Sequence, residues 1–120
     1  MPQLDQLNEE MRNCAELCTD CSDTCTETMA HCLTLGGMHA ERNHITLLAL
    51  CADTCATSAK ALFLGSPLHQ HTCRACAAVC EACADDCARM EEEFMQECAE
   101  ICRACAESCR EMSRGEIRAA

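Results

Sequence analysis

The sequence predicts an all-α protein: an antiparallel up-down-up-down four-helix bundle with a cysteine-lined core. The main observation is a spacing, C-x3-C-x2-C-x3-C, which occurs three times among the 16 cysteines. Alternating steps of three and four residues place side chains along one face of an α-helix, the face that neighbouring helices cover. No Gly/Pro-rich or low-complexity stretch separates two cores in the 120 residues, so we expect one domain over residues 1–120.

The first expected helix covers about residues 4–35 and carries five cysteines in steps of 4, 3, 4 and 7. A Gly-Gly pair follows it, and glycine commonly ends helices because it adopts the left-handed conformation. A second helix is expected at about 41–64, where the same phase holds only two cysteines, Cys51 and Cys55. Gly65 suits the position just after the end of this helix.

The third and fourth helices are expected at about 67–90 and 93–113. Ser66 and Pro67 suit the N-cap and the first position of the third helix. No glycine or proline separates these two helices, so one continuous helix is the alternative. It would be about 70 Å long at a rise of about 1.5 Å per residue, too long for the remaining chain to cover its thiols. We therefore expect a turn and an antiparallel bundle.

The composition points to a core that needs more than apolar packing. The chain has 16 Cys and 19 Ala, but only two Phe and no Trp or Tyr. Its net charge of −11, with dispersed basic residues, argues against a nucleic-acid partner. The N-terminus lacks a secretory signal pattern, and no run approaches about 18 apolar residues, so we expect no membrane association and a cytoplasmic location. In a reducing cytosol the cysteines are thiols or metal ligands.

Sixteen inward thiols predict a metal-binding core. Residues three or four apart on a helix have Cβ atoms about 5–6 Å apart, so two sulfurs can converge on one ion. Thiolates favour Cu(I), Zn(II) or iron-sulfur clusters, and such clusters usually need surrounding loops. A four-thiolate Zn(II) site carries a net charge of about −2, which is unfavourable when repeated in an apolar core. One Cu(I) on each thiolate leaves the core near neutrality, so we expect multiple Cu(I) ions per chain.

Two other functions stay open on these residues. Zinc sequestration would use the same thiols, whereas a thiol redox buffer or sensor would need accessible, reactive cysteines. A disulfide scaffold is disfavoured because cysteines at i,i+3 and i,i+4 of a helix do not normally have disulfide geometry. No Ser/His/Asp arrangement or phosphate-binding glycine loop occurs, so we expect no enzymatic activity.

Soft side chains other than cysteine extend the thiol faces at the bundle ends. In an up-down bundle His44, Met90 and Met95 fall at one end, and neutral imidazole and thioether ligands bind Cu(I) more weakly than thiolate. We predict this end as the copper entrance. At the opposite end, Leu62, Phe63 and Leu64 could plug the bundle. Most acidic residues are expected on outward, solvated faces: Glu16, Asp20, Glu27, Asp85, Asp86, Glu97, Glu100 and Glu107.

The tetrads CAELCTDCSDTC, CAAVCEACADDC and CAEICRACAESC, with a Cys-poorer helix between the first two, resemble the bacterial copper-storage proteins. The resemblance covers nearly the whole chain. It implies cytosolic storage of Cu(I), filling through an end that bears His or Met, and a homotetramer. We expect a copper chaperone or chelator as donor or acceptor. The resemblance also implies that every cysteine is a metal ligand: Cys14, Cys18, Cys21, Cys25, Cys32, Cys51, Cys55, Cys73, Cys76, Cys80, Cys83, Cys87, Cys98, Cys102, Cys105 and Cys109.

Overall fold

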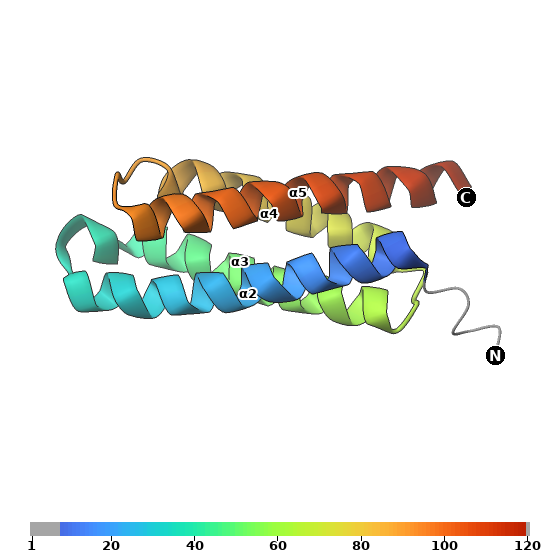
Figure 1. The fold of residues 1–120 in the computed structure, drawn as a ribbon, viewed down its shortest axis with the longest axis horizontal. Helices are drawn as coiled ribbons and strands as arrows, with labels where there is room; N and C mark the ends of the chain where they lie inside the picture. Colours follow the sequence, from blue (N-terminus) through green and yellow to red (C-terminus); the bar gives the residue numbers. More distant parts are fainter. Residues whose placement is uncertain (1–7, 120) are drawn as a thin grey trace.

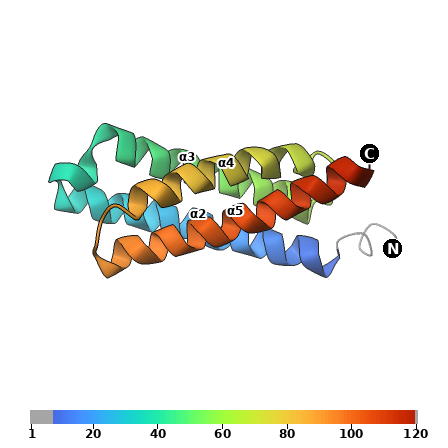
Figure 2. The same cartoon turned by 90° about the horizontal axis from the view of Figure 1, so that it is seen from above.

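The computed structural model describes residues 8–119, and within this range the chain forms four α-helices and one short 3-10 helix. Successive helices run in opposite directions along an elongated bundle (Figure 1, Figure 2). Helices α3 and α5 each pack beside both α2 and α4. The expected all-α, up-down-up-down four-helix bundle is confirmed. The elements are α2 (Glu9–Leu35), η1 (Gly37–Ala40), α3 (Arg42–Phe63), α4 (His69–Cys87) and α5 (Glu93–Ala119).

The first helix, α2, is capped at both ends by local backbone chemistry. The side-chain oxygen of Asn8 accepts a hydrogen bond from the backbone N–H of Met11 at 2.8 Å, which satisfies one free donor of the first turn. At the other end, Gly36 adopts φ of 72°, a conformation that favours glycine. The helix is described from Glu9 onward, and the part of the expectation that covers residues 4–7 lies outside the described residues.

Helix α4 starts later than the sequence predicted: it spans His69–Cys87, whereas the expected range was 67–90. Ser66 and Pro67 belong to the preceding turn instead of the helix. In that turn the hydroxyl oxygen of Ser66 accepts a hydrogen bond from the backbone N–H of Leu68 at 3.1 Å. The serine therefore caps a tight turn, and the helix begins only after the turn is complete.

The turn between α4 and α5 contains neither glycine nor proline and is held by Gln96. Its side-chain N–H group donates to the carbonyl oxygens of Ala88 at 3.3 Å and Met90 at 2.5 Å. These bonds satisfy carbonyl groups of the turn that follows α4, so the chain reverses without a helix-breaking residue. The last helix continues to Ala119 rather than ending at 113, and residues 114–119 contain no proline that would interrupt it.

The bundle core consists mainly of small side chains. All 16 cysteines are fully buried, and alanines pack among them. Leu48, Leu62 and Met95 are the largest apolar side chains in the described core with no exposed surface. Because hydrophobic stabilisation scales with the apolar area removed from water, so few large groups contribute modestly to it. Each of these three side chains therefore supplies a larger share of the hydrophobic stabilisation than it would in an ordinary core.

Helix α3 is the one helix within residues 8–119 that is long and apolar enough, by length and composition alone, to span a membrane. The sequence-based expectation rested on a different criterion, a run of about 18 apolar residues, whereas α3 passes on its mean hydropathy over an 18-residue window. Core helices of soluble proteins pass the same test, and the thiol face of α3, with Cys51 and Cys55, is buried in the bundle. The match is weak support for a membrane location.

We predict that Leu62→Ala lowers the unfolding free energy of the reduced apo-protein by about 2–5 kcal/mol, because it leaves a cavity in a core with few large side chains. Leu50→Ala is the matched control on the same helix, since Leu50 is 51% exposed and its truncation should change stability by less than about 0.5 kcal/mol. Urea unfolding followed by circular dichroism measures both. Equal losses in the two variants would contradict this account of the core.

Candidate metal centre

Every cysteine side chain is buried inside the bundle. All 16 thiols are free, and none has exposed surface. Helices α2 and α4 supply five each, α5 supplies four and α3 supplies two. This placement follows from the sequence spacing, because steps of three and four residues keep the thiols on the face that each helix turns toward the bundle axis.

Sulfur atoms from different helices approach one another closely. The Sγ atoms of Cys55 and Cys80 are 3.4 Å apart, which joins α3 to α4. The Sγ atom of Cys18 lies 3.5 Å from that of Cys109 and 3.6 Å from that of Cys105, which joins α2 to α5. The thiols therefore meet across helices rather than only along them.

These contacts build a continuous thiol column along the bundle axis. The sulfurs form four groups of three or four, and within each group all sulfur atoms lie within 4.8 Å of one another. Each group shares one cysteine with the next. Cys109, Cys105 and Cys21 are the shared members. A metal ion in one group is therefore one sulfur away from the next group. The thiol column consists of Cys14/Cys73/Cys109, Cys18/Cys76/Cys105/Cys109, Cys21/Cys55/Cys80/Cys105 and Cys21/Cys25/Cys51/Cys102.

The sulfur separations in the column suit metal ions held by several thiolates. The Sγ atoms of Cys14 and Cys109 are 3.9 Å apart, and those of Cys21 and Cys102 are 3.8 Å apart. With a metal–sulfur bond of about 2.3 Å, such pairs subtend about 110–120° at the metal, the angles of four- and three-coordinate sites. Ions could therefore bind with only small movements of the thiol side chains.

Two unloaded thiols near one end of the core, Cys32 and Cys87, are held in the protonated form. Burial raises the pKa of Cys32 to about 11, and negative charge at Cys98 and Glu92 adds to this effect. Hydrogen bonds with Cys83 and Cys98, and then burial, raise the pKa of Cys87. Metal binding at these sulfurs must therefore displace a proton.

The thiol core ends in a terminal cluster of three different soft ligands: Cys32, His44 and Met95. Cys32 Sγ lies 3.3 Å from His44 Nε2 and 3.7 Å from Met95 Sδ. All three side chains are buried, and they come from α2, α3 and α5. Met90, predicted for the same end, is also buried, and its backbone carbonyl oxygen accepts a hydrogen bond from the side chain of Gln96.

His44 is oriented by a carboxylate that the sequence analysis placed on a solvated face. His44 Nδ1 lies 2.5 Å from Asp86 Oδ2, and Asp86 Oδ1 accepts hydrogen bonds from Arg89 at 2.8 and 3.0 Å. This pattern assigns the ring proton to Nδ1, so Nε2 presents its lone pair toward Cys32. The expectation for Asp86 was wrong, since its side chain is only 11% exposed. The other acidic residues of that prediction are exposed.

The charge on Asp86 is kept by its two partners. Burial raises the pKa of this carboxyl group, but the hydrogen bonds from His44 and Arg89 outweigh burial and lower the pKa below its ordinary value. One sequence signal was present: Asp86 and Arg89 are three residues apart, the spacing of a helical ion pair. That signal does not reveal His44, which reaches Asp86 only because α3 packs beside α4.

The opposite end of the bundle is closed differently from the prediction. Leu62 is fully buried, but Phe63 is 44% and Leu64 is 74% exposed, so the expected three-residue plug is reduced to Leu62. His69 is buried at this end, with Nδ1 at 2.8 Å from the carbonyl oxygen of Ser66. That contact fixes the imidazole to the turn before α4.

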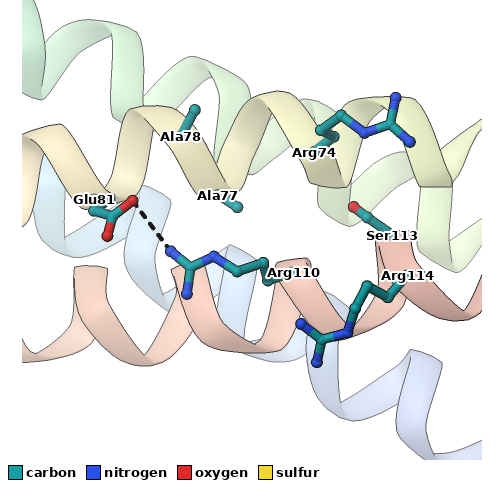
Figure 3. A pocket seen from close by; sticks show the side chains of 7 residues that line it. All are labelled: Arg74, Ala77, Ala78, Glu81, Arg110, Ser113 and Arg114. Atoms are coloured by element: carbon teal, nitrogen blue, oxygen red, sulfur yellow. Dashed lines mark ion pairs between the residues drawn. The ribbon is translucent and has the colours of Figure 1, made fainter.

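A surface pocket between α4 and α5 lies outside the thiol column (Figure 3). Arg110 crosses from α5 to Glu81 on α4, with 3.2 Å between the guanidinium nitrogen and the carboxylate oxygen. The lining contains no thiol, so the pocket offers no soft ligand and we place the metal centre in the core. The pocket is lined by Arg74, Ala77, Ala78, Glu81, Arg110, Ser113 and Arg114.

Comparison with known proteins agrees with this geometry. Residues 7–114 match the family model described as copper storage protein, Csp. The uncharacterized cysteine-rich protein YhjQ of Bacillus subtilis (strain 168) is 38% identical over 83 residues, which cover 69% of this chain and 77% of that protein.

Two solved structures of copper storage proteins share the fold. The Cu(I)-bound copper storage protein BsCsp3 is 36% identical, with a TM-score of 0.82, over 88% of this chain and 99% of that chain. A cytosolic copper storage protein from Streptomyces lividans, described with five coppers, is 32% identical, with a TM-score of 0.77, over 88% of this chain and 93% of that chain. With the match over residues 7–114, these findings show that the chain belongs to the copper storage protein family.

Proposed function

We propose that this chain stores many Cu(I) ions on the thiolates of its core and exchanges them through the end that carries the terminal cluster. The observation that carries the storage function is the thiol column, in which neighbouring sulfur groups share ligands. Shared ligands let ions occupy successive positions along one axis, as a store requires. The proposed ligands are the 16 cysteines together with His44, Met90 and Met95.

Charge favours Cu(I) over a divalent ion in this core. A buried thiolate is strongly disfavoured unless a cation compensates it, and one Cu(I) per thiolate leaves little net charge. Zn(II) in four-thiolate sites leaves about −2 at each site, and neighbouring sites in the column would repel. Zinc sequestration is therefore the second candidate, supported only by the four-sulfur groups.

A redox sensor is a poorer match to the burial of the thiols. Sensor cysteines are solvent-accessible thiols of low pKa. Here all 16 cysteines have no exposed surface. These thiols are protected from solvent oxidants in the folded apo-protein.

The terminal cluster has the ligand chemistry of an entrance. Imidazole and thioether are neutral ligands that hold Cu(I) less tightly than thiolate, so an ion bound first by His44 and Met95 gains stability on moving to thiolates. Cys32 contacts both residues and supplies the first thiolate on that route. Asp86 keeps the His44 lone pair directed at the incoming ion.

The setting of this store is also part of the proposal. We propose a single-domain, non-enzymatic protein of the cytoplasm, where a reducing environment keeps the thiols able to bind metal. A copper chaperone or a small chelator would deliver and remove Cu(I). Assembly into a homotetramer, without nucleic acid or membrane as partner, completes the proposal.

The storage function predicts a large copper capacity. Anaerobic titration of the reduced apo-protein with Cu(I), against a competing chelator, should give on the order of one tightly bound Cu(I) per thiolate, because each ion neutralises one buried charge. Zn(II) should saturate at about four or fewer ions and be displaced by Cu(I). Tight binding of only one or two coppers would exclude storage.

Asp86→Asn should slow copper uptake without changing capacity. An asparagine amide can donate to His44 Nδ1, which would move the ring proton to Nε2 and remove the lone pair that faces Cys32. Stopped-flow measurement of Cu(I)–thiolate absorbance should show an initial uptake rate about 10-fold lower, with the final copper count unchanged. Asp85→Asn, at the neighbouring side chain that is 74% exposed, is the control and should load at the wild-type rate. Equal rates in the two variants would remove Asp86 from the entrance.

Uptake should also depend on pH in a defined direction. Because the pKa of Cys32 is raised to about 11, this thiol is protonated at neutral pH, and its thiolate fraction grows about tenfold per pH unit below that value. The initial rate of Cu(I) uptake should therefore rise with pH between 7 and 9. Cys32→Ser should weaken this dependence. A wild-type rate that does not change with pH would show that Cys32 is not the first thiol to be loaded.

A further inference from the structure

One level of the core, between the terminal cluster and the nearest four-sulfur group, differs from the rest of the thiol column. On α2 this level holds Thr28, between Cys25 and Cys32 in the same helical phase. On α3 it holds Leu48, between His44 and Cys51. Both side chains are fully buried, so two of the four helices present no thiol to the axis at this level.

Neither residue is a ligand for Cu(I). Leu48 has no donor atom, and a threonine hydroxyl is a hard, neutral oxygen that Cu(I) does not favour. Within the described part of the chain, Thr28 Oγ1 has no hydrogen-bond partner. The α2 and α3 side of the core is therefore interrupted at a point that any ion from the terminal cluster must pass.

The α4 and α5 side of the same level keeps its thiols. The Sγ atoms of Cys87 and Cys98 are 3.8 Å apart. Cys98 stands between Met95 of the terminal cluster and Cys102 of the nearest four-sulfur group. In the described part of the chain, no group of three or more His, Cys, Asp or Glu ligand atoms within 4.8 Å of one another includes Cys87 or Cys98. This level therefore offers a two-thiol contact where the column beyond offers three or four.

Helical spacing connects this pair in both directions. Cys98 lies one turn after Met95 of the terminal cluster and one turn before Cys102 of the nearest four-sulfur group on α5. On α4, Cys83 lies one turn before Cys87 and continues the thiol face. A line of adjacent sulfurs thus passes the level on one side only.

We infer that Thr28 and Leu48 form a non-ligating neck between the terminal cluster and the store, and that Cu(I) crosses it only through the Cys87–Cys98 pair. The inference rests on the proposed storage function and adds to it the position that limits the rate of copper loading. Each transfer is a ligand exchange in which copper remains Cu(I). The receiving thiol gives up a proton as it binds copper, and the releasing thiolate takes one up, so charge balances at each step.

The test compares three variants that each lose one fully buried thiol: Cys87→Ser, Cys98→Ser and Cys73→Ser. Cys73 lies in the sulfur group farthest from the terminal cluster and is the matched control. All three should bind about one Cu(I) fewer than wild type at equilibrium. In anaerobic stopped-flow loading, Cys87→Ser and Cys98→Ser should fill the store about 10-fold more slowly or worse, whereas Cys73→Ser should load at the wild-type rate.

A rescue variant distinguishes the loss of the copper-transfer route from a disturbance of the fold. Thr28→Cys places a thiol on the interrupted side of the neck, between Cys25 and Cys32, so the double variant Thr28→Cys/Cys98→Ser should recover fast loading. Wild-type loading rates in Cys87→Ser and Cys98→Ser, or no recovery in the double variant, would overturn the proposal of a neck. In that case an unchanged equilibrium copper count would still support the storage function. A collapse of that count in the wild-type protein would instead overturn the storage function itself.

Discussion

Burial of sixteen thiols along one axis is the constraint on which the rest of the structure depends. Cysteines at steps of three and four residues define a single face of each helix, and that face has to be covered by other helices. Four antiparallel helices with short turns satisfy the requirement. The same arrangement brings sulfurs from different helices to 3.4–4.0 Å, so the packing that builds the core also builds the metal centre.

Because the core consists mainly of small polarizable side chains, metal binding and folding are thermodynamically coupled. Large apolar side chains are few, so apolar burial contributes less than in an ordinary bundle. Ions that bind the folded state and bridge helices add stability in proportion to their affinity and concentration. The unloaded protein must nevertheless remain folded if it is to take up copper, which explains why Leu48 and Leu62 persist among the thiols and occupy fully buried positions.

The sequence was sufficient to predict the helical bundle and the inward thiols, because both follow from helical periodicity. It also placed His44 and Met95 at one end, where the structure brings them to Cys32. Asp86 was missed because its contact with His44 joins two helices, and no local pattern reports the approach of one helix to another. The end of α4 was placed too late because Gln96, a side chain of the next helix, stabilises the turn after Cys87 through the carbonyl groups of Ala88 and Met90.

The most direct test of the account is a crystal structure of the Cu(I)-loaded protein with copper located by its anomalous scattering. The account predicts a row of copper ions along the bundle axis, each held by sulfurs of the thiol column from at least two helices, with no ion bound in the surface pocket of Figure 3. Copper bound at surface carboxylates or histidines, with the core thiols left unligated, would contradict it.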